Sequence, residues 1–197
     1  MPLPKTAALI LSLLLPLPVV ATVPMPKVVE TKCALCHGKL GESGSDELAV
    51  LAGQNEKYLA KQLKDFISGR RKSPTMARMV RGLGDADVES LSRYYAAQKP
   101  PAHKITDADL HAAGRFLFQK GSLAPGAPSC QICHGEKALG TDFAPRLAGQ
   151  HAPYLERQLR EFSQRERTND NEIMHTVASK LSPFDVKALA EYLATLE

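Results

Sequence analysis

Cys-Ala-Leu-Cys-His at residues 33–37 recurs as Cys-Gln-Ile-Cys-His at residues 130–134, and Leu-Ala-Gly-Gln at 51–54 recurs at 147–150. When the sequence is compared with itself at an offset of 96 residues, ten of the 21 positions from residue 51 to residue 71 are identical. Two units are too few for a solenoid, so the pattern predicts a duplicated domain. Pairs that match across the two units include Tyr58/Tyr154, Gln62/Gln158, Phe66/Phe162, Arg71/Arg167, Met76/Met174, Leu91/Leu189 and Tyr94/Tyr192.

The joint between the units falls at Lys-Pro-Pro-Ala, residues 99–102, because proline ends a helix. We therefore expect one domain over residues 22–100 and a second over residues 101–197. Within each unit the apolar residues recur at helical spacing, and no convincing alternation of apolar and polar residues is present. The sequence predicts an all-α fold. The residues expected on buried helix faces are Tyr58, Leu59, Leu63, Phe66 and Ile67, then Val88, Leu91 and Tyr95, and in the second unit Tyr154, Leu155, Leu159, Phe162, Val186, Leu189, Tyr192 and Leu193.

A further helix is expected from about Asp109 to Gln119, with Thr106 or Asp107 as its N-cap and Gly121 near its end. Its counterpart in the first unit is shorter, around residues 27–31. Each unit has fewer than 100 residues and few large aromatic side chains. Domains this small often need a disulfide, a metal or another filler to be stable.

Residues 1–21 have the pattern of an export signal, with a basic Lys5, an apolar run and a small residue, Ala21, at the expected cleavage point. The alternative is a retained membrane anchor. The apolar run is shorter than the roughly 20 residues that a spanning helix needs, and Pro16 and Pro18 interrupt its end. We therefore predict cleavage after Ala21.

Composition is that of a globular protein, with 44% apolar and 23% charged residues in 197. A net charge of +4 is too small to indicate a dedicated nucleic-acid-binding protein. The charge is unevenly placed, because residues 22–100 carry 13 basic and 9 acidic side chains and residues 101–197 carry 11 and 12. This asymmetry favours an acidic partner for the first unit.

All four cysteines lie in Cys-X-X-Cys-His, which is the attachment signature of c-type haem. In such a site two thiols add to the haem vinyl groups and the histidine ligates the iron. We predict two covalently bound haems c. A zinc site built from both pairs, thioredoxin-like redox chemistry and structural disulfides are the alternatives, and the trailing histidine in both units disfavours each. The predicted ligands are Cys33, Cys36, Cys130 and Cys133 to the haem vinyl groups, with His37 and His134 to iron.

The sixth iron ligand decides between an electron carrier and a site open to small molecules. Methionine, histidine and an empty position are the possibilities. Met76 and Met174 are the one pair of methionines that superposes under the repeat, so we predict that these two residues ligate iron. Met79 aligns with Val177 and is the obvious substitute for Met76. No histidine outside the two motifs has a histidine as its repeat partner, and we expect surface or supporting roles for His103, His111, His151 and His175.

The order of these motifs resembles the dihaem cytochrome c4 family over essentially the whole chain after residue 21. Each Cys-X-X-Cys-His is followed by Leu-Ala-Gly-Gln, a Tyr-Leu-X-X-Gln-Leu helix, an arginine and the methionine. The resemblance implies two class I cytochrome c domains joined by a short linker. It also implies a periplasmic location, often in contact with the inner membrane, and delivery of electrons to a terminal oxidase.

One departure from the family pattern concerns the proline whose carbonyl accepts the ring N–H of the haem histidine. The second unit has this residue as Pro145, whereas the first has Ala49. The hydrogen bond can survive with any residue, but the fixed φ of proline is lost, so we expect the two haems to differ in potential or ligand rigidity. The aligned Arg71 and Arg167 have two open interpretations, a guanidinium near a haem propionate or an exposed arginine at a helix end.

These features predict an exported dihaem electron carrier rather than an enzyme. Its expected partners are redox proteins, such as a quinol-oxidising complex as donor and a terminal oxidase as acceptor, with possible inner-membrane association. We expect a monomer that binds no nucleic acid. One alternative is the cytochrome subunit of a larger dehydrogenase, such as a flavocytochrome that oxidises sulfide. The other is a dihaem peroxidase, which the methionine in both units disfavours.

Overall fold

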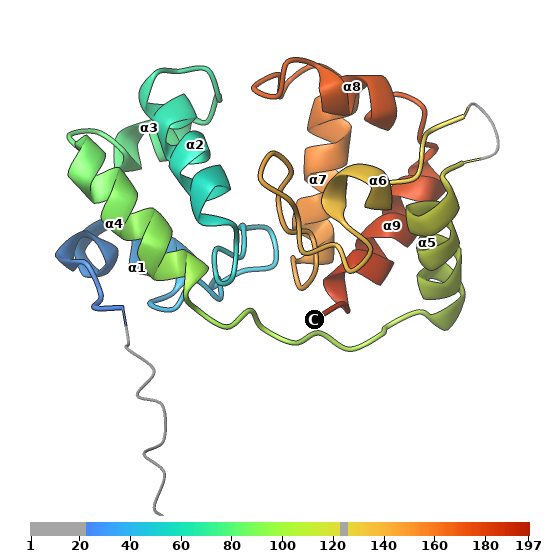
Figure 1. The fold of residues 1–197 in the computed structure, drawn as a ribbon, viewed down its shortest axis with the longest axis horizontal. Coiled ribbons are helices and arrows are strands. Elements are labelled where there is room, and N and C mark those ends of the chain that lie inside the picture. The colour runs from blue at the N-terminus through green and yellow to red at the C-terminus, as the bar shows by residue number, and fades with distance from the viewer. Residues whose placement is uncertain (1–22, 123–125) are drawn as a thin grey trace, which may run out of the picture.

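The structure is a computed structural model that describes residues 23–122 and 126–197. The helices form two groups, one before and one after an extended linker that runs along one side of the molecule (Figure 1). Nothing in the described part of the chain is a β-strand. The predicted all-α class is therefore confirmed, and the expected export signal, residues 1–21, lies wholly outside the described residues.

The first unit begins with a π-helix, η1 (Val29–Cys33), that continues directly into α1 (Ala34–His37). It is completed by α2 (Glu56–Ile67), α3 (Pro74–Met79) and α4 (Asp85–Ala96). Its core joins Val29 of η1 to Leu59 of α2 and to Leu91 and Tyr95 of α4. The short helix expected at residues 27–31 is thus part of a longer helical segment that reaches His37.

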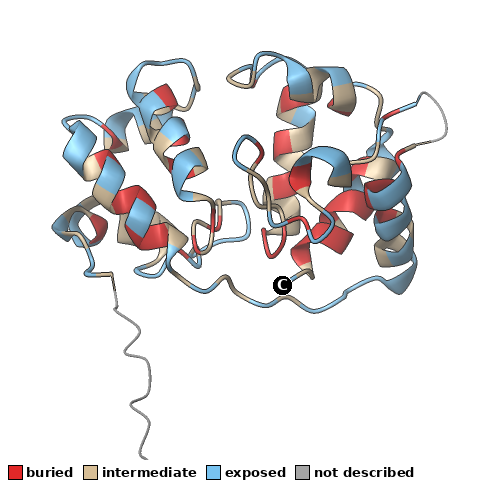
Figure 2. Cartoon of the chain, in the orientation of Figure 1, coloured by how far each residue is buried: buried red, intermediate tan, exposed pale blue. Residues whose placement is uncertain are grey.

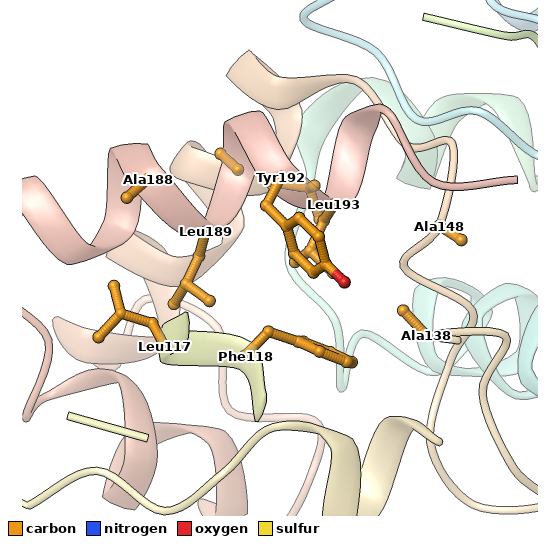
Figure 3. Packing of buried hydrophobic residues seen from close by; sticks show 10 residues of the cluster. Leu117, Phe118, Ala138, Ala148, Ala188, Leu189, Tyr192 and Leu193 are labelled. Carbon is orange, nitrogen blue, oxygen red and sulfur yellow. The ribbon is translucent and has the colours of Figure 1, made fainter. Parts of the chain in front are cut away.

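The second unit contains α5 (Ala108–Lys120), α6 (Gln131–His134), α7 (Ala152–Ser163), α8 (Ile173–Ala178) and α9 (Pro183–Ala194). Asp107 caps α5 by accepting hydrogen bonds from two backbone N–H groups of its first turn, and the helix ends at Gly121 with φ 80°. The expected limits of this helix are correct to within one residue. Leu117 and Phe118 of α5 pack against Leu189 and Tyr192 of α9 (Figure 3).

Buried residues gather on the inner sides of α4 and α9, while much of α5 faces solvent (Figure 2). Most of the predicted core is correct, including Leu59, Leu91, Leu155 and Leu189, which are all buried. Ile67 is an exception, because it lies at the end of α2 and is 47% exposed. The segment after α2 turns away toward α3 and leaves this side chain uncovered.

The Leu-Ala-Gly-Gln motif forms a turn in each unit, and the linker packs against both copies. Gly53 and Gly149 have φ values of 66° and 71°, which favour glycine. A Cβ on Gly53 would lie 2.7 Å from Pro100 Cγ, and one on Gly149 would lie 3.4 Å from Pro100 Cβ. The glycine of the motif therefore permits both the turn and the close approach of the linker proline.

Within residues 23–122 and 126–197, no helix is long and apolar enough to cross a membrane.

Candidate functional site

The four cysteines lie on or directly beside short helices. Cys33 is the last residue of η1 and Cys36 lies on α1, whereas Cys130 is the N-cap of α6 and Cys133 lies on that helix. Each pair is thus separated by about one helical turn, and all four thiols are free. Across the two described stretches, no three His, Cys, Asp or Glu side chains gather closely enough to hold a metal ion.

The histidine that follows each pair is held by a backbone carbonyl. His37 Nδ1 lies 3.0 Å from the carbonyl oxygen of Ala49, and His134 Nδ1 lies 2.9 Å from that of Pro145. Burial lowers the pKa of both imidazoles, so both are neutral at neutral pH. A carbonyl can only accept, so Nδ1 carries the proton and Nε2 is left with a free lone pair for a metal.

In the first unit, where Ala49 replaces proline, the hydrogen bond from the histidine is present. Its carbonyl acceptor, however, is shared with a second donor. Ser43 Oγ also donates to the carbonyl oxygen of Ala49, at 2.5 Å. The repeat partner of Ser43 is Gly140, which has no hydroxyl, and both residues adopt positive φ, 69° and 85°. Sequence reasoning missed Ser43, although a serine where the other unit has glycine was visible in the alignment of the repeats.

The two predicted methionine ligands lie at equivalent places on α3 and α8. The backbone N–H of Met76 donates to Ser73 Oγ at 3.2 Å, and that of Met174 donates to a carboxylate oxygen of Asp170 at 2.6 Å. Both side chains are half-buried. Each methionine is therefore placed on a helical turn that a side chain fixes at its start. Met79 is also half-buried, one turn further along α3.

Glutamines of the repeated motif clasp the two domains together. Gln54 accepts from the backbone N–H of Arg146 at 2.8 Å and donates to its carbonyl at 2.8 Å. Gln150 makes the same pair of bonds to Val50, at 2.8 and 3.0 Å. Both glutamines are buried. Each makes the same two bonds to the other unit, so the contact is reciprocal and nearly two-fold symmetric. The sequence shows that these residues repeat, but it does not show that each one bonds to the other unit.

A second reciprocal network lies between α2 and α7 and involves both repeated arginines. Arg71 donates to Gln62 and to Gln158, each at 2.9 Å. Arg167 donates to the same two side-chain oxygens, at 3.1 and 2.6 Å. Each guanidinium therefore bridges the two domains.

The same arginines reach a tyrosine of the opposite domain. Arg71 donates to Tyr154 Oη at 3.1 Å, and Arg167 donates to Tyr58 Oη at 2.8 Å. Burial alone would raise the pKa of Tyr154, but the charges of Arg71 and Arg167 lower it. Arg167 is only 8% exposed, so the interpretation of these residues as exposed arginines at helix ends is wrong.

Two histidines outside the motifs meet where the linker passes the second domain. The rings of His103 and His151 lie edge to face, with centroids 4.9 Å apart. The Nε2 atom of each is buried without a hydrogen-bond partner in the described structure. His175 Nδ1 lies 3.1 Å from the carbonyl of Phe162, and His111 packs against Tyr192. The non-ligating roles expected for these four histidines stay predictions.

The residues around the first cysteine pair fit a covalently attached planar group. Tyr95 Oη is buried beside Cys33 without a hydrogen-bond partner, and burial raises the pKa of that hydroxyl. Two free thiols one turn apart, followed by a neutral imidazole held at Nδ1, are the donor set of haem c.

Comparison with known proteins decides the family. A cytochrome c family model matches residues 111–197. Cytochrome c4 of Pseudomonas aeruginosa is 39% identical over 168 residues, which cover 83% of each chain. The chain belongs to the cytochrome c4 family. The crystal structure of reduced recombinant cytochrome c4 from Pseudomonas stutzeri covers 86% of this chain and 95% of its own, with a TM-score of 0.81 and 38% identity.

A second group of relatives is named for another partner. The thiosulfate dehydrogenase electron acceptor of Thiomonas intermedia is 37% identical over 169 residues, covering 82% of this chain and 77% of its own. The structure of thiosulfate dehydrogenase TsdBA from Marichromatium purpuratum matches 84% of this chain with a TM-score of 0.75 and 35% identity, but only 36% of its own length.

Membership of the cytochrome c4 family confirms the predicted tandem class I cytochrome c fold. The chain is therefore an electron-transfer protein that carries covalently bound haem c, and two haems fit its two domains. Its partners are redox proteins.

Proposed function

We propose that each domain binds one haem c and that both irons have histidine and methionine as axial ligands. Cys33 and Cys36 form the thioethers in the first domain, and Cys130 and Cys133 form them in the second. His37 would ligate the iron in the first domain and His134 the iron in the second. Met76 and Met174 would supply the thioether ligands. The hydrogen bond from each imidazole Nδ1 to a backbone carbonyl is the observation that carries this proposal.

Haem iron supplies a reversible one-electron change between Fe(II) and Fe(III). The protein chain orients the proposed iron ligands through fixed contacts. Ala49 and Pro145 hold the two imidazole rings in one orientation and one tautomer. Ser73 and Asp170 fix the turns that carry Met76 and Met174. Because thioether sulfur favours Fe(II), these methionines keep the potential above that of a bis-histidine site.

The glutamine clasp holds the two domains in a fixed arrangement, which would keep the distance for electron transfer between their haems constant. We infer that the protein is exported to the periplasm after cleavage at Ala21, where it works as a monomer and contacts the inner membrane. The domains extend over residues 22–100 and 101–197. It takes electrons from a donor such as a quinol-oxidising complex and delivers them through the respiratory chain to a terminal oxidase.

A second candidate function is electron acceptance from a thiosulfate dehydrogenase. Two relatives that carry this name, from Thiomonas intermedia and Stutzerimonas stutzeri, are 37% and 34% identical to the chain. This role is a second form of the dehydrogenase alternative, beside the sulfide-oxidising flavocytochrome. Rapid reduction of the oxidised protein by thiosulfate plus a thiosulfate dehydrogenase, with no oxidation by a terminal oxidase, would favour it.

The coordination is tested by an absorption spectrum of the reduced protein before and after carbon monoxide, with covalent haem counted per chain. We expect two haems and no carbon monoxide adduct in the wild type. Met76→Ala and Met174→Ala are each expected to open one iron to carbon monoxide, whereas Met25→Ala, at an exposed position, is the control. An adduct in the wild type would overturn the axial assignment, and an adduct in Met79→Ala alone would move the first ligand to Met79.

A further inference from the structure

Charge differs sharply between the two domains around the methionine segments. Residues 66–84 of the first domain contain five basic and no acidic side chains. The equivalent residues 162–182 of the second domain contain three basic and three acidic side chains. The excess of positive charge in the first half of the chain is therefore concentrated beside Met76.

Three cations of the first domain occupy positions where the second domain has a hydroxyl. One of them precedes the first cysteine pair and the other two follow Met76. Lys32 Nζ donates to the backbone carbonyl of Arg81 at 2.7 Å, so the two segments meet. The three aligned pairs are Lys32/Ser129, Arg78/Thr176 and Arg81/Ser179.

These three cations lack neutralising partners, whereas a nearby arginine has one. No carboxylate of the described residues lies within 4.0 Å of Lys32, Arg78 or Arg81. In contrast, Arg70 pairs with Asp65 at 2.7 Å. Arg78 and Arg81 are exposed, and Lys32 is half-buried. Their charge is therefore available to a molecule that approaches from solvent.

An apolar side chain lies three residues after Lys32, on the turn between the first pair of cysteines. Leu35, between the first pair of cysteines, is 95% exposed. Its partner in the second domain, Ile132, is 72% exposed. Both domains thus present an apolar residue at the haem-attachment turn, but only the first domain has unpaired cations at the three aligned positions. An apolar contact with surrounding charge is the composition of a transient protein interface.

We propose that Lys32, Arg78, Arg81 and Leu35 form a docking surface for the acidic face of a redox protein. The proposal rests on the proposed function, because the surface adjoins the predicted haem-binding segments. One electron crosses it. One centre is oxidised by one electron and the partner's centre is reduced by one, or the reverse, and no atom is transferred.

An acidic protein fits this surface better than an anionic lipid bilayer. The cations adjoin Cys33 and Met76, where electrons enter or leave the proposed haem. A lipid surface would cover this point and offer no redox centre in return. Electrostatic attraction also accelerates the encounter of two proteins and is lost at high salt, which suits a carrier that must bind briefly and leave.

The test uses the dihaem protein on a gold electrode coated with a carboxylate-terminated alkanethiol monolayer, which stands in for an acidic face. Voltammetry reports both the bound amount and the rate of electron transfer. The first variant, K32S/R78T/R81S, gives the first domain the residues of the second. The matched variant, S129K/T176R/S179R, makes the opposite exchange. A third variant, Leu35→Ser, removes the apolar contact.

We expect K32S/R78T/R81S to bind at least about tenfold more weakly than the wild type at low salt, and to match it in 1 M salt. S129K/T176R/S179R should bind more strongly than the wild type, and Leu35→Ser should lower the electron-transfer rate. Wild-type binding by K32S/R78T/R81S would overturn the proposal. Binding of the wild type to vesicles containing 30% phosphatidylglycerol through the same cations, with a redox-silent layer on the electrode, would overturn it in favour of a lipid surface.

The haem count and the carbon monoxide spectrum are measured on every variant. If both match the wild type while the binding result contradicts our expectation, the docking surface is wrong and the proposed coordination stands. If the wild type itself binds carbon monoxide, the proposed coordination fails whatever the electrode shows.

Discussion

At the scale of single residues, the two domains differ in the carbonyl that accepts a hydrogen bond from the haem histidine. In the second domain Pro145 offers its carbonyl to His134 alone, whereas in the first domain Ala49 accepts from both His37 and Ser43. A carbonyl that takes two donors binds each more weakly. His37 is therefore the less basic ligand, which favours a higher potential for the first haem.

Replacing Ser43 by alanine removes the competing donor and should lower the potential of the first haem. We expect a shift on the order of 20–40 mV, which corresponds to the ordinary net value of one hydrogen bond. A spectroelectrochemical titration that resolves both haems measures it. Ser45→Ala, in the same loop but exposed, is the control. Two potentials that stay unchanged in Ser43→Ala would contradict this account of the first domain.

The crossing of α5 and α9 is a close contact between two elements of the second domain. A Cβ on Gly114 would lie 1.9 Å from the carbonyl oxygen of Ala188 and 2.7 Å from Tyr192 Cβ. Gly114 thus lets the two helix backbones approach and brings Phe118 against Tyr192, whose ring centroids lie 5.7 Å apart. Helix propensity disfavours glycine at this place, so packing decides the residue.

Gly114→Ala should destabilise the second domain despite alanine's higher helix propensity. The methyl group cannot enter without separating α5 from α9, and overpacking of this kind costs about 1–3 kcal/mol. Differential scanning calorimetry of the holoprotein should show a lower melting temperature for one of the two domain transitions. Arg115→Ala, at the next and exposed position, should leave both transitions in place. An unchanged or raised melting temperature for Gly114→Ala would show that the crossing relaxes freely.

At the scale of the whole molecule, docking of the two domains combines symmetric and asymmetric contacts. Gln54 and Gln150 act as equivalents, but the residues that follow them do not. Asn55 donates to the carbonyls of Thr141 and Ala144 in the other domain, whereas its repeat partner is the titratable His151. His151 meets His103 of the linker. One half of the contact therefore depends on pH and the other does not.

Acid should loosen this docking through His151. Burial first, and then the charge of His103, lower its pKa below 6.5, although the backbone of Glu42 and the charge of Asp46 act in the opposite direction. The separated domains therefore bind the proton more readily than the docked ones. The stability of the docked form is complete above pH 6.5 and is lost as the pH falls through the lowered pKa.

Small-angle X-ray scattering at pH 7.5 and pH 5.0 measures this effect as an increase in radius of gyration on acidification. His151→Asn copies the first domain and should abolish the increase. Because the haem-binding histidines are the same in both proteins, their titration cannot produce the difference. An equal expansion of wild type and His151→Asn would assign the acid response to another group.

Local chemistry in the sequence determined much of this protein. Asp107 and Gly121 mark the ends of α5 because capping and positive φ depend on the residue itself. The repeat predicted two similar all-α domains. Cys-X-X-Cys-His predicted haem c because the motif itself contains the thiols and the imidazole that bind the haem. The apolar spacing predicted buried faces but placed Ile67 on one of them, since periodicity does not show where a covering element ends.

Only the tertiary structure decided what the repeated polar residues do. Gln54, Gln150, Arg71 and Arg167 were visible as repeats, yet each has partners in the other domain, 83–109 residues away along the chain. Hydrogen bonds across such separations depend on how two finished domains dock, and residue type alone carries no information about that geometry. The same holds for Ser43, because the sharing of one carbonyl by two donors requires a distance that spacing in the sequence does not fix.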